Sequence, residues 1–304
     1  MIKRTLYFGT PVHLRVRNAQ LEINIPHAQG IDKKLCNTIP VEDIGVVIID
    51  HNQITFTHSV LHKLLGNNVA FITCDETHHP VGLMLNLSGH TIQRERFTEQ
   101  LEASEPLKKN LWQQTIKAKI RNQAALLAKH GVDVKPMLHW ANEVTSGDAL
   151  NHEARAAAYY WKVLFKDYVK EFRRERFGVY PNNLLNYGYS ILRATVARGL
   201  VGSGLMPILG IHHRSKYNDY CLADDVMEPY RPFVDEMVLK LVATKNKLTE
   251  LDIEIKRELL QIPALNIIID GNKSPLMVGL QRTTASLSNC FSGETRKLLY
   301  PELM

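Results

Sequence analysis

The chain has 304 residues, enough for one large domain or two domains of ordinary size. Hydrophobic residues make up 45% of it, which excludes an intrinsically disordered chain. Lysine and arginine number 37 against 31 acidic residues, and this net charge of +6 permits a nucleic-acid partner without requiring one. No run approaches the roughly 20 apolar residues that span a bilayer, and the N-terminus lacks a signal sequence, so we expect a soluble cytoplasmic protein with no membrane partner.

The cysteines are widely separated. They are Cys36, Cys74, Cys221 and Cys290, and no two of them form a CxxC pair. Zinc sites and disulfide frameworks have closer, paired spacings, so we predict free thiols in a reducing compartment.

The first part of the chain, up to about residue 88, has the pattern of a β domain. Short runs of β-branched and aromatic residues are separated by turn residues, at 5–8, 13–17, 20–25, 45–50, 69–73 and 81–85. Residues 59–65 fit one short helix, which Gly66 and Asn67 would end. The hairpin-like spacing of the strands predicts a small β-sandwich.

After Gly89 the hydrophobic pattern becomes that of helices. We predict helices over 107–129, 148–176 and 183–202, from about 223 with an interruption at Pro229, over 245–261, and from 274 to about 290. The expected fold class is therefore α+β. A small N-terminal β-sandwich domain, residues 1–88, precedes a larger all-α catalytic domain, residues 89–304.

The strongest candidate for a functional site is the stretch 210–232. It holds a histidine pair, a loop rich in cations and aromatic residues, and an acidic helix start. Histidine, aspartate and glutamate suit a divalent cation whose substrate also brings oxygens. Asp225 and Glu228 are three residues apart and so would share a helix face, 12 and 15 residues after His213. For Asp224, helix capping competes with metal ligation.

A further carboxylate is expected from Glu153. It lies at the edge of the apolar stripe of the predicted helix over 148–176, among alanines, and no side chain one helical turn away can pair with it. Burying an unpaired carboxylate is costly, so a metal or a cationic partner should lie nearby. Glu153, His213 and Glu228 would surround Mg²⁺ or Mn²⁺ with two carboxylates and one imidazole, and the imidazole somewhat favours Mn²⁺.

Several segments together resemble one known family. It is the universal CRISPR-associated adaptation integrase and endonuclease, the Cas-one family, in the form found beside type II systems. The resemblance extends over nearly the whole chain. It is carried by residues 4–7 (RTLY), 39–44 (IPVEDI), 151–154 (NHEA), 182–189 (NNLLNYGY), 199–200 (GL), 209–213 (LGIHH) and 225–232 (DVMEPYRP).

The resemblance implies a metal site. The metal ligands of the family correspond by position to residues that look like Glu153, His213 and Glu228 in this sequence. Asp225 matches an acidic position that the resemblance suggests is supporting. Histidine occupies both 212 and 213, and the spacing after Gly210 favours His213 over His212. The implied catalytic residues are these same three ligands, with Mg²⁺ or Mn²⁺ as cofactor.

The resemblance also implies partners and a reaction. The family forms homodimers through the β domains, and two such dimers flank a dimer of the small Cas-two protein. That complex captures a short duplex, the prespacer, and inserts it at the leader end of a CRISPR array; the effector nuclease is a further candidate partner. The implied chemistry is metal-dependent transesterification, in which a prespacer 3′-hydroxyl attacks a phosphodiester at the repeat boundary.

Basic and aromatic side chains are the candidates for holding DNA. Cations make phosphate contacts and aromatic rings stack on bases. The predicted DNA-binding residues are Arg214, Lys216, Tyr217, Arg231, Lys162 and Lys166, and Lys117, Lys119 and Arg121 form another basic cluster. Two alternatives stay open: a metal-dependent nuclease acting on branched DNA, and a non-catalytic DNA-binding scaffold whose acidic cluster is structural.

Overall fold

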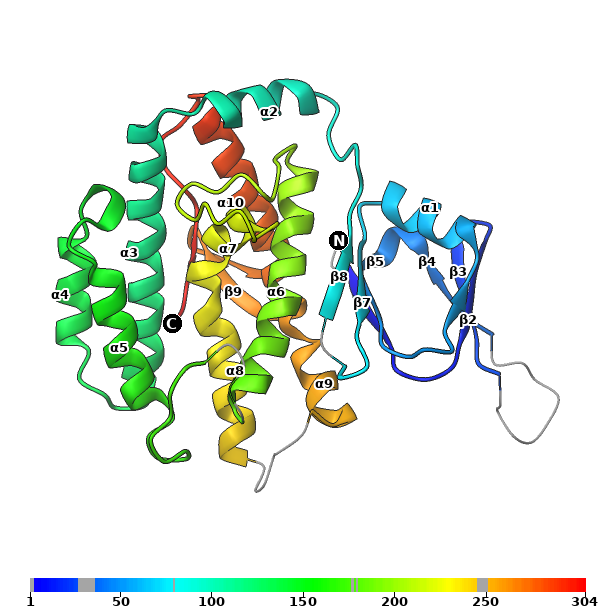
Figure 1. Cartoon of the computed structure of the whole chain (residues 1–304), viewed down its shortest axis with the longest axis horizontal. Coiled ribbons are helices and arrows are strands. Elements are labelled where there is room, and N and C mark those ends of the chain that lie inside the picture. The colour runs from blue at the N-terminus through cyan, green and yellow to red at the C-terminus, as the bar shows by residue number, and fades with distance from the viewer. Residues whose placement is uncertain (1–2, 27–35, 79, 176–177, 179, 245–250) are drawn as a thin grey trace. The chain divides into compact units, whose positions relative to one another are not determined.

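The computed structural model describes residues 3–26, 36–78, 80–175, 178, 180–244 and 251–304 (Figure 1). The chain divides into a first unit, Met1–Gly89, and a second unit, His90–Met304. The division lies next to the boundary expected at residue 88. Part of the helix predicted over 245–261 falls on 245–250, outside the described residues.

The first sheet of the first unit is mixed. Its order is β1-β5-β7-β8, in which β1 (Arg4–Phe8), β5 (Ile44–Ile49) and β7 (Ala70–Cys74) run parallel. β8 (Pro80–Met84) is antiparallel to β7. All six residues of β5 are buried. A central parallel strand has neighbours on both sides and covered faces, which explains its continuous apolar run.

The second sheet of this unit has the order β4-β3-β2-β6. β4 (Cys36–Pro40), β3 (Gln20–Asn24) and β2 (His13–Arg17) are antiparallel, and β6 (Thr55–Phe56) pairs in parallel with β2. Helix α1 (His58–Gly66) contacts a strand of each sheet. The two sheets and α1 enclose one core, made of Val12, Leu14, Leu21, Val41, Ile44, Val47, Ile49, Val60, Leu64, Val69 and Phe71. The predicted sandwich is confirmed, although its three parallel strands need crossovers that hairpin spacing does not predict.

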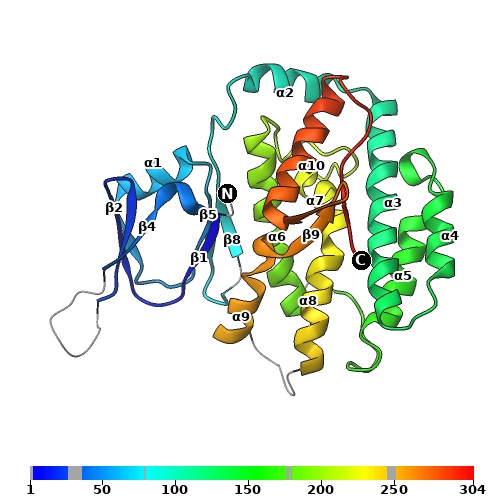
Figure 2. The same cartoon turned by 180° about the vertical axis from the view of Figure 1, so that it is seen from behind.

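The second unit is organised around one long helix, α3 (Glu105–Lys129). Its start is capped by Ser104, whose side chain accepts the Leu107 N–H. α3 packs against α4 (Lys135–Glu143) and α5 (His152–Leu164) on one side, as both views show (Figures 1 and 2). On its other side lie the short helices that carry the acidic segment. This central position lets α3 reach both sides of the candidate site.

The remaining helices complete the unit. Except for the first, which like α4 was not predicted, they fall in stretches predicted to be helical, so the α+β class is confirmed. They are α2 (Gln93–Glu102), α6 (Asn182–Gly202), α7 (Cys221–Met227), the 3-10 helix η3 (Glu228–Tyr230), α8 (Arg231–Thr244), α9 (Ile253–Leu259) and α10 (Leu276–Phe291). The predicted interruption at Pro229 is confirmed as the 3-10 turn between α7 and α8.

The second unit is nevertheless not entirely helical. β9 (Asn266–Ile269) lies between β10 (Asn272–Pro275) and β11 (Pro301–Glu302) in a small antiparallel sheet. Asp270 and Gly271 connect β9 to β10 with φ values of 52° and 70°. An Asp-Gly pair with both φ values positive is the two-residue turn that favours a hairpin. The prediction of a wholly helical domain is corrected by this sheet.

The helix predicted over 148–176 is shorter than expected. Asn151 has a left-handed φ of 54° and α5 begins only at His152. α5 ends at Leu164, and the chain turns so that the Phe172 ring lies 4.7 Å from that of Phe165. This aromatic contact competes with continuation of the helix. Lys166 is therefore not on a helix, contrary to the prediction.

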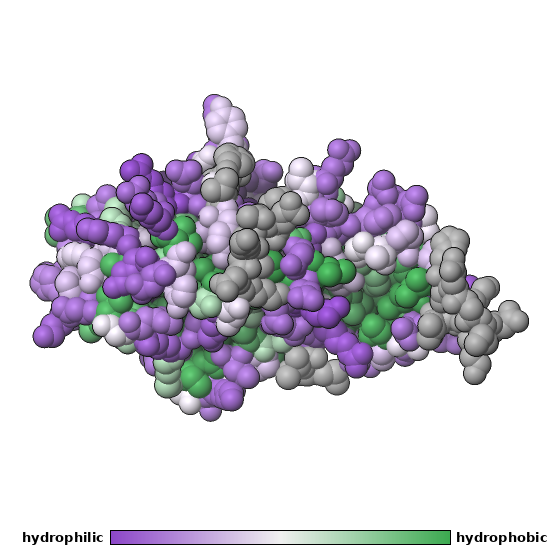
Figure 3. Space-filling view, turned by 90° about the horizontal axis from the view of Figure 1, so that it is seen from below, coloured by the Kyte–Doolittle hydropathy of each residue, from purple (hydrophilic) through white to green (hydrophobic). Residues whose placement is uncertain are grey.

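The character of the surface, the absence of a membrane-spanning helix from the described residues and the state of the cysteines complete the description of the fold. On the face shown in Figure 3 hydrophilic residues predominate, and hydrophobic ones form small separate areas. Within the described ranges, no helix combines the length and apolarity that crossing a bilayer requires. Cys74, Cys221 and Cys290 are free thiols, as predicted, while the side chain of Cys36 lies outside the described part.

Candidate active site

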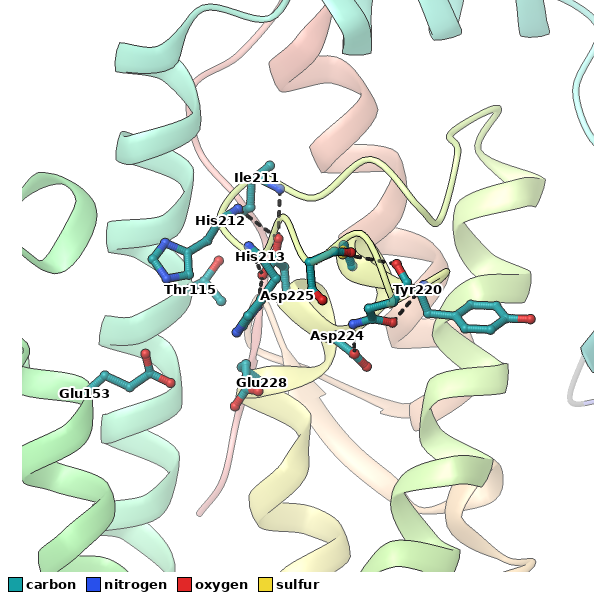
Figure 4. Close-up of polar contacts among 12 residues, drawn as sticks. Thr115, Glu153, Ile211, His212, His213, Tyr220, Asp224, Asp225 and Glu228 are labelled. Atoms are coloured by element: carbon teal, nitrogen blue, oxygen red, sulfur yellow. Dashed lines mark hydrogen bonds and ion pairs between the residues drawn. The ribbon is translucent and has the colours of Figure 1, made fainter. Parts of the chain in front are cut away.

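The three predicted metal ligands come together in the second unit from three separate elements. Glu153 is in the first turn of α5, His213 is in the loop after α6, and Glu228 begins η3. Figure 4 shows the His213 ring pointing toward Glu228, with the Glu153 carboxylate directed toward the same space. Glu228 is buried, and the Glu153 side chain is 26% exposed. The site therefore opens to solvent on the Glu153 side.

Lys119 of α3 lies between the two glutamates. Its Nζ is 2.6 Å from Oε1 of Glu153 and 2.6 Å from Oε2 of Glu228. Burial disfavours the ammonium, but the charges of Glu228 and Glu153 outweigh burial and raise the pKa of Lys119. Lys119 is thus the cationic partner of Glu153, and its assignment to a surface basic cluster is corrected.

Arg231 holds the other oxygen of Glu228. One of its guanidinium nitrogens is 3.0 Å from Oε1 of Glu228, and its Cζ atom lies 4.8 Å from the centre of the Tyr189 ring. Burial raises the pKa of the Glu228 carboxyl, but the cations Arg231 and Lys119 outweigh it, so the pKa is lowered. Arg231 is engaged inside the cluster, and its predicted contact with DNA would have to compete with Glu228.

Asp225 organises the histidine loop. Its fully buried carboxylate accepts the backbone N–H groups of Ile211 at 2.8 Å and His212 at 2.9 Å on Oδ2, and that of His213 at 3.3 Å on Oδ1. Gly210 fits this turn because a Cβ there would lie 2.3 Å from the His213 carbonyl oxygen. Charge-assisted bonds of this kind fix a loop strongly.

The same carboxylate orients the His213 ring. Oδ1 of Asp225 is 2.5 Å from Nδ1 of His213, which leaves Nε2 directed away from Asp225. This hydrogen bond raises the pKa of His213, and partial burial opposes the change. A carboxylate on one ring nitrogen is the usual support of a metal-binding histidine. The supporting position of Asp225 agrees with its predicted role, which stays a prediction.

His212 has different surroundings. Its ring stacks on that of Trp112, with 4.1 Å between centroids and 1° between planes. Burial lowers the pKa of His212, and the charge of His213 lowers it further. The environment of His213, beside the carboxylates, favours it over His212 as the ligand.

The donor set fits Mg²⁺ or Mn²⁺, and the ion itself stays a prediction. Two carboxylates and a supported imidazole leave the remaining positions to water and phosphate oxygens. Oε2 of Glu228 is buried and accepts no directional hydrogen bond, although the Lys119 ammonium lies within ion-pair distance. In the described part of the chain no three His, Cys, Asp or Glu side chains already stand close enough to hold a metal. These side chains would therefore have to move closer together to hold a metal ion.

The predicted DNA contacts lie in two places. Beside His213, a pocket of about 380 Å³ is lined by Arg214 and Lys216, together with Lys108, which sequence reasoning missed. Arg214 is exposed and binds both oxygens of Glu105, at 2.8 and 2.6 Å. Tyr217 is 85% exposed, with the Lys216 ammonium 4.9 Å from its ring centre.

The second place is a depression beside α5. Exposed Lys162 and Lys166 line it with Trp161 and Phe172. Cations around aromatic rings are the surface type that single-stranded nucleic acid prefers. DNA binding by these residues stays a prediction.

Sequence reasoning missed the role of Lys119, although one signal was present. Lys119 lies between Ile116 and Ile120, both fully buried, on the inward face of α3. A lysine on the buried face of a helix requires an anionic partner. Its partners could not be named because they lie on other elements.

Known proteins of one family are similar to this chain in sequence and in fold. The family described as "CRISPR associated protein Cas1" matches residues 6–262. The chain is 36% identical over 271 residues to the CRISPR-associated endonuclease Cas1 of Neisseria meningitidis serogroup C, with 88% of each chain covered. Its fold is similar to a casposase bound to an integration product, with a TM-score of 0.79, 20% identity and coverage of 98% of this chain and 92% of that one. A Cas6-RT-Cas1–Cas2 complex gives a TM-score of 0.73 at 20% identity, over 98% of this chain and 36% of the other.

Proposed function

This chain belongs to the CRISPR-associated Cas1 family, and on that premise we propose that it is a metal-dependent DNA integrase and endonuclease of CRISPR adaptation. The observation that carries the proposal is the convergence of Glu153, His213 and Glu228, with Asp225 on the far side of the imidazole. The name of the Neisseria relative and the integration product bound to the casposase support phosphodiester chemistry. The identity to the Neisseria protein is consistent with the type II form.

The residues of the chain would hold and orient the cofactor. Glu153, His213 and Glu228 would bind Mg²⁺ or Mn²⁺, which stabilises negative charge on a reacting phosphate when bound. Asp225 keeps the imidazole in one orientation, so that Nε2 faces the ligand site. Arg231 restrains Glu228 from the opposite side. Such restraints reduce the ordering cost of reaching the reactive geometry.

The reaction proposed is strand transfer. A 3′-hydroxyl of prespacer DNA attacks a phosphodiester of the leader-repeat DNA, one P–O bond forms and one breaks, and the displaced 3′-oxygen leaves with a proton. No protein nucleophile is needed. The pocket beside His213 would take the backbone phosphates, with Arg214 exchanging Glu105 for phosphate and Tyr217 stacking on a base.

The partners proposed follow from the family. They are duplex prespacer DNA, the leader-repeat DNA, a second copy of this chain in a homodimer, a Cas-two dimer between two such homodimers, and the effector nuclease. The Cas1–Cas2 complex with a similar fold supports the Cas-two partner. Dimerisation would use the first unit, and the reaction would take place in the cytoplasm.

A plasmid integration assay tests the proposal. A labelled prespacer duplex, supercoiled target plasmid, the purified small partner and Mn²⁺ or Mg²⁺ are incubated with wild type, Glu153→Ala, His213→Ala or His212→Phe. We expect joined product to fall by orders of magnitude in the first two variants, because each loses a ligand. His212→Phe keeps an aromatic ring on Trp112 and should retain activity.

The products separate the alternatives. Shortened strands without joined product would indicate a nuclease for branched DNA. DNA binding with no metal-dependent cleavage or joining would indicate a scaffold. Equal joined product from all four proteins would show that the site is structural.

A further inference from the structure

The Lys119 ammonium occupies the space that both glutamate ligands face. It contacts Glu153 and Glu228 at 2.6 Å each, and its side chain is 11% exposed. We infer that Lys119 is an internal counter-cation, which a divalent ion displaces on binding, and that it thereby sets the metal affinity of the site. The inference rests on the proposed function, because it takes the two glutamates as metal ligands.

Both oxygens of Glu228 are already paired with cations. Oε1 faces Arg231 at 3.0 Å and Oε2 faces Lys119 at 2.6 Å. A divalent ion would have to approach one of these oxygens to about 2.1 Å. An ammonium within hydrogen-bond distance of that oxygen would then be repelled by two positive charges at short range. One of the two cations must therefore move.

Lys119 is the cation better placed to leave. Arg231 is held by the Tyr189 ring as well as by Glu228, and its planar group is rigid. The Lys119 ammonium contacts the two glutamates, and it lies at the end of a flexible four-carbon stem. Bending that stem moves the ammonium toward the partly exposed side of Glu153.

Without a metal, Lys119 has a second effect. The two carboxylates face one gap, and Glu228 is almost completely buried. Removal of their shared cation would leave like charges facing each other in a poorly hydrated place, which is strongly unfavourable. Lys119 therefore acts as a positioning residue that holds the ligands ready. Replacing Lys119 with a neutral side chain should lower the thermal stability of the metal-free protein and raise its affinity for the metal.

Two measurements on the full-length protein test the inference. Mn²⁺ binding is followed through the electron paramagnetic resonance signal of the free ion, and thermal unfolding through tryptophan fluorescence. Lys119→Met keeps the length of the side chain and removes its charge. Lys117→Met is the matched control. It removes the same charge two residues away, from a lysine that makes no ion pair within the described part of the chain. Lys119→Arg keeps a cation in the gap.

We expect Lys119→Met to bind Mn²⁺ about tenfold more tightly than wild type, since displacing a charged hydrogen bond no longer opposes binding. In EDTA its melting temperature should fall below that of wild type and of Lys117→Met, and Mn²⁺ should restore it. Lys119→Arg should bind Mn²⁺ no more tightly than wild type. Lys119→Gln serves as the neutral variant if Lys119→Met does not fold.

Failures of the inference and of the proposed function are distinguishable. Wild type that binds Mn²⁺ through Glu153, with no tightening in the neutral variants, overturns the displacement inference alone. Binding to wild type that Glu153→Gln leaves unchanged, or no binding to any variant, overturns the proposed metal site and the inference together. In that case the three side chains form a structural ion-pair cluster.

Discussion

Asp225→Asn should release the histidine loop without removing a proposed metal ligand. The carboxylate accepts N–H groups from Ile211, His212 and His213 and contacts the His213 ring, all within 3.3 Å. An asparagine turns one of the two oxygens into an NH₂ group, which faces donors and loses at least two of these bonds. At about 1.5–3 kcal/mol for each bond to a charged group, the loss of two bonds should cost the loop about 3–6 kcal/mol.

Chemical denaturation and hydrogen exchange measure this loss. All three tryptophans lie in the second unit, so their fluorescence reports the unfolding of that unit. The amides of Ile211 and His212 should exchange much faster in Asp225→Asn. The free energy of unfolding of the second unit should also fall, up to the point at which the loop opens locally while the rest of the unit stays folded. Asp224→Asn is the control, because its partners are different. Unchanged protection of both amides, with a loss below about 1 kcal/mol, would refute the loop-anchoring argument.

Three further outcomes are expected. Burial raises the pKa of Asp235 from 3.8 to about 6, so protonated Asp235 stabilises the fold below pH 3.8, and this stabilisation is lost as pH rises through 6. In urea titrations, the free energy of unfolding of wild type relative to Asp235→Asn should therefore rise by about 2 kcal/mol between pH 7 and pH 4. A difference that does not depend on pH would contradict this. Gly210→Ala should lower the melting temperature by several degrees, since its Cβ would lie 2.3 Å from a backbone oxygen, and an unchanged value would contradict the close approach. Replacing Lys162 and Lys166 by glutamine should reduce the salt dependence of DNA binding by about two counterions without changing sequence preference, whereas an unchanged slope would exclude phosphate contacts.

The candidate site could be predicted from the sequence because its residues sit in distinctive local patterns. His213 follows Gly210 by three positions, and Asp225 and Glu228 share one short helical stretch. These patterns are independent of how the helices pack. The ion pair of Lys119 with Glu153 joins residues 34 apart on two helices, and it depends on the packing of α3 against α5. No local rule reports such a contact.

The fold, like the site, could be predicted where it depends on local sequence and not where it depends on packing. Most helices were predicted from their period, because an apolar stripe every 3.6 residues is a local property. The end of α5 at Leu164 depends on ring contacts with Phe172, which the hydrophobic periodicity of residues 148–176 cannot show. The small sheet was missed for a different reason. Asp270-Gly271 is a local hairpin signal, but the strands on either side of it are short and lie between longer helical patterns.

The acidic helix start illustrates why the local pattern left its chemistry open. Capping and ligation both favour acids there, but the side chains do not cap α7. Asp224 binds Arg193 of α6, at 2.7 Å, and Asp225 binds the histidine loop, while Glu228 faces Lys119 of α3 and Arg231.

Three buried acids within five residues are tolerable only because separate elements each supply a partner. Removing a partner leaves an uncompensated buried charge, at a cost of about 3–5 kcal/mol. The cluster thus forms only when α3, α6 and α7 are packed together. Loss of integration in a variant of any cationic partner, Arg193 included, therefore indicates a catalytic role only if the second unit of that variant is still folded.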